Sequence, residues 1–262
     1  MSPQAMQRPL GSRPGKMIVA LLGLNVVAWV LEVVFIRLGF DVIRTFGLSP
    51  ASVFEEGLVW QPLTHMLLHH PGAPTHLLFN MLFLWLFGTP LEAWWGGRRL
   101  LVAYVVCGLG GAILTLSVGL LSRLDWLAPA LASFWAVPHV GASGAIMGLT
   151  VSWGMAFANQ RMNFLLLGEM TGKTFVLIII LFELLVLISL EQGTSSTSHF
   201  GGMAAAVILT KGLWRPSRWA ELVGQRRLQA RKRRIEKELR VIEGGKGKTP
   251  DEGLPSDPKK WN

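Results

Sequence analysis

Six long apolar runs constrain this chain more than any other feature. They cover residues 17–36, 76–95, 100–121, 143–159, 174–190 and 199–213. A helix of roughly 20 apolar residues crosses a bilayer core of about 30 Å. With 51% hydrophobic and only 16% charged residues, the composition excludes an ordinary soluble enzyme. We therefore expect an all-α membrane protein with six transmembrane helices.

The basic residues are strongly localised. Of the 25 Lys and Arg residues, 15 lie between Lys211 and Asn262. With a cytoplasmic N-terminus, 22 of the 25 fall on the cytoplasmic side, where loops of membrane proteins carry their positive charge. We expect both termini in the cytoplasm, and four parts: a cytoplasmic segment 1–16, a six-span domain 17–215, a basic cytoplasmic helix 216–243 and a disordered tail 244–262.

The basic tail has several interpretations. A helix bound to anionic lipids of the inner leaflet and a solvated charge run both fit it. Nucleic acid is not expected as a partner, because the placement of positive charge inside already explains the tail. The external segment 37–75 is similarly open: its apolar residues, Trp60 among them, fit either a partly embedded loop or an element packed against the bundle.

Two polar groups stand at the external starts of apolar runs. Ser143 opens the fourth run in Gly141-Ala142-Ser143-Gly144, where the free N–H groups of a helix N-terminus would stabilise an oxyanion. A Ser N-cap in a glycine-rich turn is the commoner meaning of such a tetrapeptide. His199 opens the sixth run, and a neutral imidazole is the usual base for a serine nucleophile. A helix-capping histidine is the alternative.

Small residues link these two runs. Gly144 and Gly148 on the fourth, and Gly202 and Ala206 on the sixth, form small-xxx-small steps that let membrane helices approach closely. Such packing would bring the serine and the histidine within hydrogen-bond reach.

On the second run, His76 and Asn80 are spaced four apart and share one helix face. Both can donate hydrogen bonds, so they could complete an oxyanion hole with the serine N–H. A polar clasp between helices explains them equally well.

Taken together, the His76–Asn80 motif, the Gly141–Gly144 motif and His199 with Gly202 resemble the rhomboid family of intramembrane serine proteases, over roughly residues 17–215. The resemblance implies a six-helix bundle and a catalytic dyad without a third acidic member. In it, Ser143 is the nucleophile, His199 the base, and His76 and Asn80 contribute to the oxyanion site. Substrates would be single-span membrane proteins cut within or beside a helix, with no cofactor or metal.

The sequence departs from the family pattern at three places: Gln61 replaces an arginine, Pro71 a histidine, and Met147 an aromatic residue that would stack under the base. Two further expectations concern the fifth and sixth runs. The polar linker Glu191–Ser198 is expected to be a flexible cap, with the fifth run as a lateral gate. Glu183, like Glu32 on the first run, is expected to be a protonated or paired structural carboxyl that is not close to the dyad; a gating or proton site is the alternative.

The leading hypothesis is thus a serine endopeptidase, multi-pass in a bacterial plasma membrane, that cleaves transmembrane proteins. A catalytically silent rhomboid-like protein that binds or escorts membrane helices is the main alternative. A small-solute transporter is a weaker one, because inverted halves are not evident.

Overall fold

The computed structural model of the chain describes residues 13–124, 133–164, 168–188 and 193–212, with 228–229 and 232–233. The long helices are α1 (Lys16–Arg37), α5 (Pro74–Trp95), α6 (Gly97–Leu121), α9 (Ser143–Ala156), α10 (Gly172–Ile188) and α11 (Gly193–Thr210). The short ones are α2 (Val42–Phe46), α3 (Pro50–Phe54), α4 (Gln61–Thr64), the 3-10 turn η2 (His65–Leu67) and α8 (Ser133–Ala136).

Each of the six expected runs is a helix. By length and apolarity, α1, α5 and α6 can each cross a membrane. The helices α9, α10 and α11 are shorter, with 14, 17 and 18 residues. The largest difference from expectation is at α11, which begins six residues before His199.

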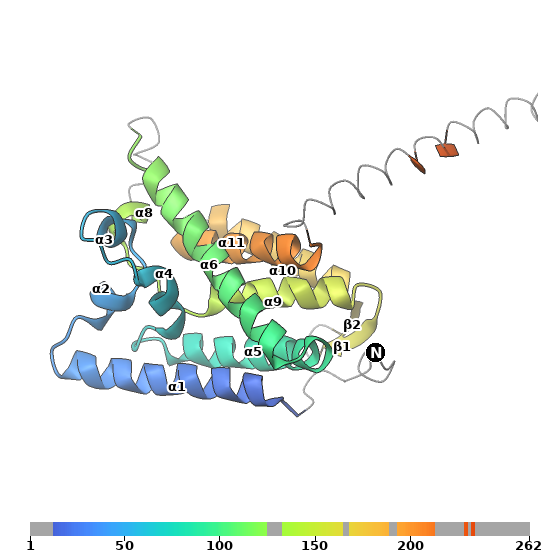
Figure 1. Cartoon of the computed structure of the whole chain (residues 1–262), viewed down its shortest axis with the longest axis horizontal. Helices are drawn as coiled ribbons and strands as arrows, with labels where there is room; N and C mark the ends of the chain where they lie inside the picture. Colours follow the sequence, from blue (N-terminus) through green and yellow to red (C-terminus); the bar gives the residue numbers. More distant parts are fainter. Residues whose placement is uncertain are drawn as a thin grey trace, which may run out of the picture. The chain divides into compact units, whose positions relative to one another are not determined.

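The helices pack in a fixed order. Helix α6 contacts α9 and α11, α9 contacts α5, and α5 contacts α1. In Figure 1, α1, α5 and α9 run side by side and α6 crosses in front of them. The buried Trp153 of α9 lies 4.9 Å from the ring of Phe87 in α5 and 6.0 Å from that of Phe175 in α10. These aromatic contacts join three helices in one core.

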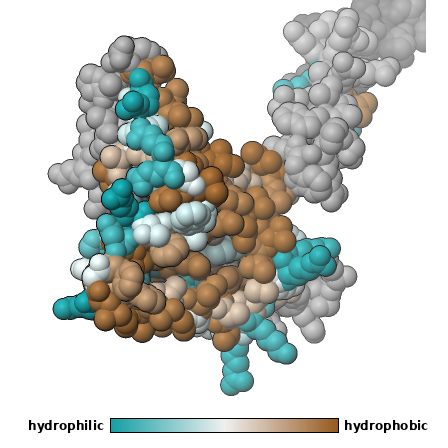
Figure 2. Space-filling view, turned by 60° about the vertical axis from the view of Figure 1, so that its left-hand side comes forward, coloured by the Kyte–Doolittle hydropathy of each residue, from teal (hydrophilic) through white to brown (hydrophobic). Residues whose placement is uncertain are grey.

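The surface of the described residues suits a lipid environment. Figure 2 shows a broad apolar band, with hydrophilic residues gathered along the left-hand side and at the lower right. Large apolar side chains of α1 and α10 contribute to the exposed apolar surface; Val27 and Leu185 are 55% and 65% exposed. Lone exposed apolar residues are ordinary on soluble proteins, but whole helices of them are not. The chain is a membrane protein.

The external segment is a packed lateral element with an apolar outer side. Its helices α3 and α4 contact α6, and Met66 is buried against α6 beside Gly108. On the outer side, Val59 and Trp60 are 73% and 43% exposed. Packing against the bundle is therefore confirmed, and partial embedding of the segment in the membrane stays a prediction.

A small β-hairpin corrects the all-α interpretation. Strand β1 (Arg161–Phe164) pairs antiparallel with β2 (Gly168–Thr171) between α9 and α10. Met162 and Met170 lie opposite each other, and both pack against the main hydrophobic core. Alternate residues of a strand point to one face, so a loop with polar and apolar residues in alternation can bury one side of a hairpin.

The terminal expectations lie mostly outside the described residues. Residues 1–12 and 234–262 are not described, so the N-terminal segment 1–16 and the tail 244–262 carry almost no structural information. Of the basic helix 216–243, residues 228–229 and 232–233 are described, and they are helical. The described residues up to Lys211 belong to one compact unit, and the few described residues from Gly212 onwards lie outside it.

Candidate active site

Ser143 is the first residue of α9, directly after a turn that glycine makes possible. Gly141 has φ +131°, a conformation that side chains with a Cβ disfavour, and a Cβ there would also press against the His76 ring. The N–H of Gly141 donates to the carbonyl of His65 at 2.9 Å. Because the first N–H groups of a helix have no helical acceptor, those of Ser143 and Gly144 point out of the start of α9.

His199 lies in the second turn of α11, not at its start. The expected flexible linker is wrong for its described part, because residues 193–198 are helical and Ser196, Thr197 and Ser198 are buried. The reason is lateral pairing: the hydroxyl of Thr197 lies 2.9 Å from that of Thr115 in α6. A Ser- and Thr-rich stretch therefore forms a buried helix face, and its Thr197 hydroxyl finds a partner in another helix.

The small-residue contact between α9 and α11 is confirmed. A Cβ on Gly202 would collide with the carbonyl oxygen of Gly144, and a Cβ on Gly144 would come within 2.5 Å of the Ser198 hydroxyl. Helix α6 joins the same contact, since a Cβ on Gly148 would meet Cys107 at 2.5 Å. We call this contact of α6, α9 and α11 the glycine junction. It brings the backbones of α9 and α11 together just below Ser143 and His199.

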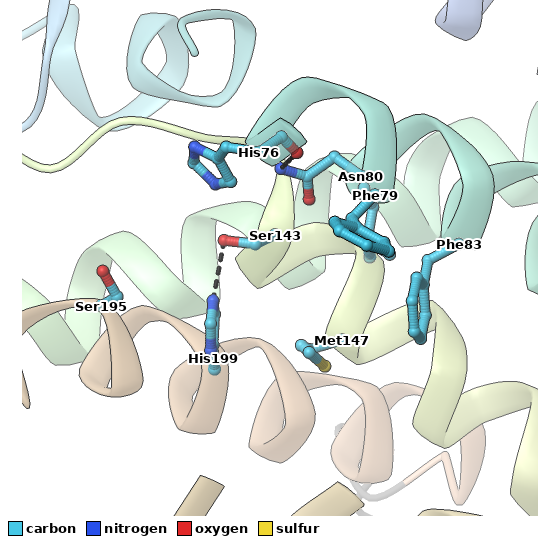
Figure 3. A pocket seen from close by; sticks show the side chains of 9 residues that line it. His76, Phe79, Asn80, Phe83, Ser143, Met147, Ser195 and His199 are labelled. Carbon is cyan, nitrogen blue, oxygen red and sulfur yellow. Dashed lines mark hydrogen bonds between the residues drawn. The ribbon is translucent and has the colours of Figure 1, made fainter. Parts of the chain in front are cut away.

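The junction brings the two candidate catalytic side chains into contact. Ser143 Oγ and His199 Nε2 are 2.8 Å apart, an ordinary hydrogen-bond length for a hydroxyl and a ring nitrogen (Figure 3). The other ring nitrogen, Nδ1, lies 2.9 Å from Oε2 of Glu183. The expectation that Glu183 is remote from this pair is therefore wrong.

Depth along the helices could have identified Glu183 from the sequence. It lies five residues before the end of α10, and His199 lies six residues after the start of α11. At 1.5 Å per residue, the two are about 7.5 and 9 Å from neighbouring helix ends, and so at similar depth. Glu183 is conspicuous in the sequence because its neighbours are apolar. Its shared depth with His199 is hidden there, because the apolar pattern places His199 at the start of its helix, whereas α11 begins at Gly193.

His76 and Asn80 face the pair from α5 across a small cavity (Figure 3). The side-chain amide of Asn80 donates one hydrogen bond to the carbonyl of His76 at 3.0 Å, which leaves its second N–H for another acceptor. The sequence-predicted site residues therefore line one cavity together.

The cavity has a volume of about 240 Å³. Beside the polar residues its walls are apolar, formed by Phe79, Phe83, Ile146 and Met147. Met147 lies one turn after Ser143 and packs against the buried cluster around Cys107 and Ala206. A flexible thioether thus fills the position where the family pattern has an aromatic ring.

The external element fixes the turn before Ser143. Leu48 and His139 exchange two backbone hydrogen bonds of 2.8 Å, which tie the element to the segment that enters α9. Gln61 is fully buried; its side chain accepts from the N–H of Ser49 at 3.0 Å and donates to the carbonyl of Arg44 at 2.8 Å. The Gln61 departure is therefore accommodated by neutral hydrogen bonds inside the element.

Buried histidines surround this turn outside the spanning helices. Burial lowers the pKa of His65 to about 4, although its hydrogen bond to the Gln61 carbonyl acts in the opposite direction. Burial also lowers the pKa of His139 to about 4, and the nearby His65 adds to the shift. Both rings are therefore neutral at pH 7.

His69 lies beside His76, two residues before the Pro71 departure. Its ring lies 5.3 Å from that of His76, and its backbone N–H donates to the buried side chain of Glu32 at 2.9 Å. Burial first, and then the nearby His76, lower the pKa of His69 to about 4. Among residues with described positions, no three His, Cys, Asp or Glu side chains gather as a metal site requires.

Comparisons with known proteins match one family model and several relatives. The family model described as "Rhomboid domain" matches residues 56–216. Three of the relatives that carry the words rhomboid protease in their names are as follows. GluP of Bacillus subtilis strain 168 is 29% identical over 72% of this chain, and YdcA of the same strain is 30% identical over 72%. AarA of Providencia stuartii is 24% identical over 73%.

The matched region is a different share of each relative. It covers 84% of YdcA and 70% of AarA, but only 32% of GluP. For GluP, the comparison therefore concerns about a third of that protein.

Proposed function

The chain belongs to the rhomboid family, and on that premise we propose that it is an intramembrane serine endopeptidase with Ser143 as nucleophile and His199 as general base. The observation that carries the proposal is the 2.8 Å hydrogen bond between Ser143 Oγ and His199 Nε2. The two residues come from different helices, 56 positions apart, and a chance contact of this chemistry inside an apolar bundle is uncommon.

The reaction follows from the positions of these groups. His199 Nε2 takes the proton of Ser143 as Oγ attacks the carbonyl carbon of the substrate, and the carbonyl electron pair moves to its oxygen. The N–H groups at the start of α9, with His76 and Asn80 from α5, stabilise that oxyanion. His199 then gives the proton to the leaving amine, and water hydrolyses the acyl-enzyme by the same base.

The cavity receives the substrate. The cleaved segment, as the family resemblance implies, unwinds from a transmembrane helix and enters the cavity of about 240 Å³ in an extended form. Transmembrane proteins are the substrate class, and the apolar walls of Phe79 and Phe83 suit their side chains.

The length of α9 accounts for cleavage inside the membrane. Its 14 residues span about 21 Å, which is shorter than a bilayer core of about 30 Å. When the far end of α9 reaches one boundary, Ser143 lies roughly 9 Å below the other. The helices α9, α10 and α11 complete a six-span bundle with α1, α5 and α6.

The proposed location and orientation in the membrane rest on the charge distribution. The protein is multi-pass in a bacterial plasma membrane, with residues 1–16 and the basic helix 216–243 in the cytoplasm. The positive side of the chain faces the cytoplasm, and the 15 basic residues after position 210 attract anionic lipids.

Cleavage of a single-span model substrate in liposomes tests the proposal. The unmodified protein should cleave it, and Ser143→Ala and His199→Ala should each abolish cleavage. A fluorophosphonate should label the unmodified protein and Ser195→Ala, a second serine that lines the cavity, but not Ser143→Ala. A folded protein that binds the substrate without cleavage or labelling would instead be the silent, helix-escorting form.

A further inference from the structure

The carboxyl group of Glu183 is placed unusually for a helix as apolar as α10. The described buried residues of α10 are Gly172, Phe175 and Glu183, and Glu183 is only 5% exposed. Its neighbours Phe182 and Leu184 are exposed, so the carboxyl side of the helix is the side that faces the bundle. An ionisable group buried in this way is costly unless it is paired.

The partner of Glu183 is the nitrogen of His199 that Ser143 does not use. Glu183 Oε2 lies 2.9 Å from Nδ1, and Ser143 Oγ lies 2.8 Å from Nε2. The three side chains come from α10, α11 and α9, and form one continuous row of hydrogen bonds. Both ring nitrogens of His199 are therefore engaged.

The charge of Glu183 decides what the other nitrogen of the ring can do. An ionised carboxylate only accepts hydrogen bonds, so it requires the proton of a neutral imidazole to be on Nδ1. The lone pair is then on Nε2, which is the arrangement that accepts the proton of Ser143. When His199 takes that proton, it carries a positive charge, and the carboxylate beside it stabilises this charge in a poorly solvated site.

We propose that Glu183 is a positioning residue that holds His199 in the Nδ1–H tautomer and stabilises its protonated form, so that the site works as a Ser143–His199–Glu183 triad. The inference rests on the proposed protease function and departs from the dyad that the family resemblance implies. Glu183 itself takes no part in the proton transfer. The proton moves from Ser143 Oγ to His199 Nε2 and then to the leaving amine, and the cleaved C–N bond supplies the electron pair for that N–H.

The amide variant Glu183→Gln separates this role from simple anchoring of α10 to α11. Glutamine has nearly the same size and can still bond to Nδ1, so the helix contact remains. Its NH2 group can donate to Nδ1, which moves the ring proton to Nε2 and leaves no lone pair for Ser143. In full-length protein in liposomes, with a single-span model substrate, kcat should fall about 100-fold or more, while KM changes less than about threefold.

The ring tautomer provides a readout that does not depend on turnover. With ¹⁵N-histidine labelling, the His199 signals are identified as those missing from His199→Ala. In the unmodified protein they should show a protonated Nδ1 and an unprotonated Nε2. Glu183→Gln should reverse or mix this pattern, whereas Glu183→Asp, which keeps the charge with a shorter reach, should recover part of kcat.

Glu32→Gln is the matched control, because it also removes a buried carboxyl from a membrane helix. That carboxyl accepts a hydrogen bond from the backbone N–H of His69 and not from His199. It should leave the His199 signals unchanged. Unaltered kcat and tautomer in Glu183→Gln, or a protonated Nε2 in the unmodified protein, would overturn the inference. Failure of the unmodified protein to cleave would count against the proposed function, and the tautomer would still decide the role of Glu183.

Discussion

The glycine junction and helix α10 hold their site residues in opposite ways. At the junction, α9 and α11 meet backbone to backbone, and there is no space for even a methyl group at Gly202. Helix α10 has apolar side chains exposed along most of its length and is buried at only three of its described residues. Ser143 and His199 belong to the first region, and Glu183 belongs to the second.

The two regions meet two different requirements of the site: a fixed geometry for Ser143 and His199, and a single contact for Glu183. The nucleophile and base must hold one geometry, and close packing of main chains restricts their motion more than flexible side chains can. Glu183 needs only to reach Nδ1 from an outer helix that packs on the bundle through side chains such as Phe175 and Val176. The following predictions test whether stability and activity respond differently in the two regions.

Gly202→Ala should have the largest effect. The added methyl group collides with the Gly144 carbonyl, so α9 and α11 must separate and the Ser143–His199 bond lengthens. Overpacking of this kind destabilises by about 1–3 kcal/mol. Cleavage and fluorophosphonate labelling should fall at least about tenfold, with a lower Tm in detergent. Gly23→Ala in α1 is the control, because its Cβ meets nothing within 4 Å; equal behaviour of the two variants would refute the rigid junction.

Acid should lower the stability of the protein through the buried histidines around the turn before α9. His65 and His139 have pKa values of about 4 in the folded protein and about 6.5 when unfolded, so the unfolded chain binds more protons below pH 6.5. Stability is therefore complete above about pH 6.5 and declines towards pH 4. At pH 5 we expect a loss on the order of 2 kcal/mol for each of the two histidines, and so about 4 kcal/mol in all.

The measurement is Tm in detergent at pH 7.5, 6 and 5. His139→Asn removes one of the two titrating groups, so its Tm should depend less on pH than that of the unmodified protein. An unchanged slope would indicate that this ring is not the source of the acid sensitivity.

Thr115→Val should have a moderate effect. It removes the hydroxyl pair between α6 and α11 and leaves the Thr197 hydroxyl with fewer partners, which destabilises by about 1 kcal/mol. The double variant Thr115→Val with Thr197→Val should lose less unfolding free energy than the two single variants lose together. In the double variant neither position keeps a hydroxyl that has lost its partner across the helix contact. Strict additivity of the changes in unfolding free energy would argue against a direct bond.

Leu185→Ala on α10 should have the smallest effect. The side chain is 65% exposed on the outer face, so its truncation leaves no internal cavity, and the unfolding free energy should change by less than about 0.5 kcal/mol. A drop in Tm as large as that of Gly202→Ala would erase the distinction between the two regions.

The sequence predicted the parts of the structure that depend on local pattern. Apolar run length placed all six long helices within a few residues, except at α11. The small-xxx-small steps at Gly144 and Gly202 predicted the α9–α11 contact, because close approach of helices requires the absence of side chains at defined spacings. With that contact, the pairing of Ser143 and His199 followed.

Features that depend on partners from distant segments were missed. The sequence predicted a flexible linker at Ser196–Ser198 because a polar Ser/Thr run suits a loop. The Thr115–Thr197 bond and the close packing of Ser198 on Gly111 and Gly144 explain why this stretch is helical and buried. Glu183 was assigned no partner for the same reason. The sequence likewise did not predict that Leu48 pairs with His139 or that Gln61 is buried. Both features join segments that are distant in the chain, and no local pattern shows that such segments are neighbours.

The missing side chain at Gly202 also limits how this chain can diverge. A single base change that introduces any other residue there moves a whole helix, because the obstacle is the main-chain carbonyl of Gly144, which no second substitution in α9 removes. The outward face of α10 has no such constraint, and can adjust its apolar residues one by one to membranes of different thickness or composition. Variation among descendants of this chain should therefore accumulate on the lipid-facing helices.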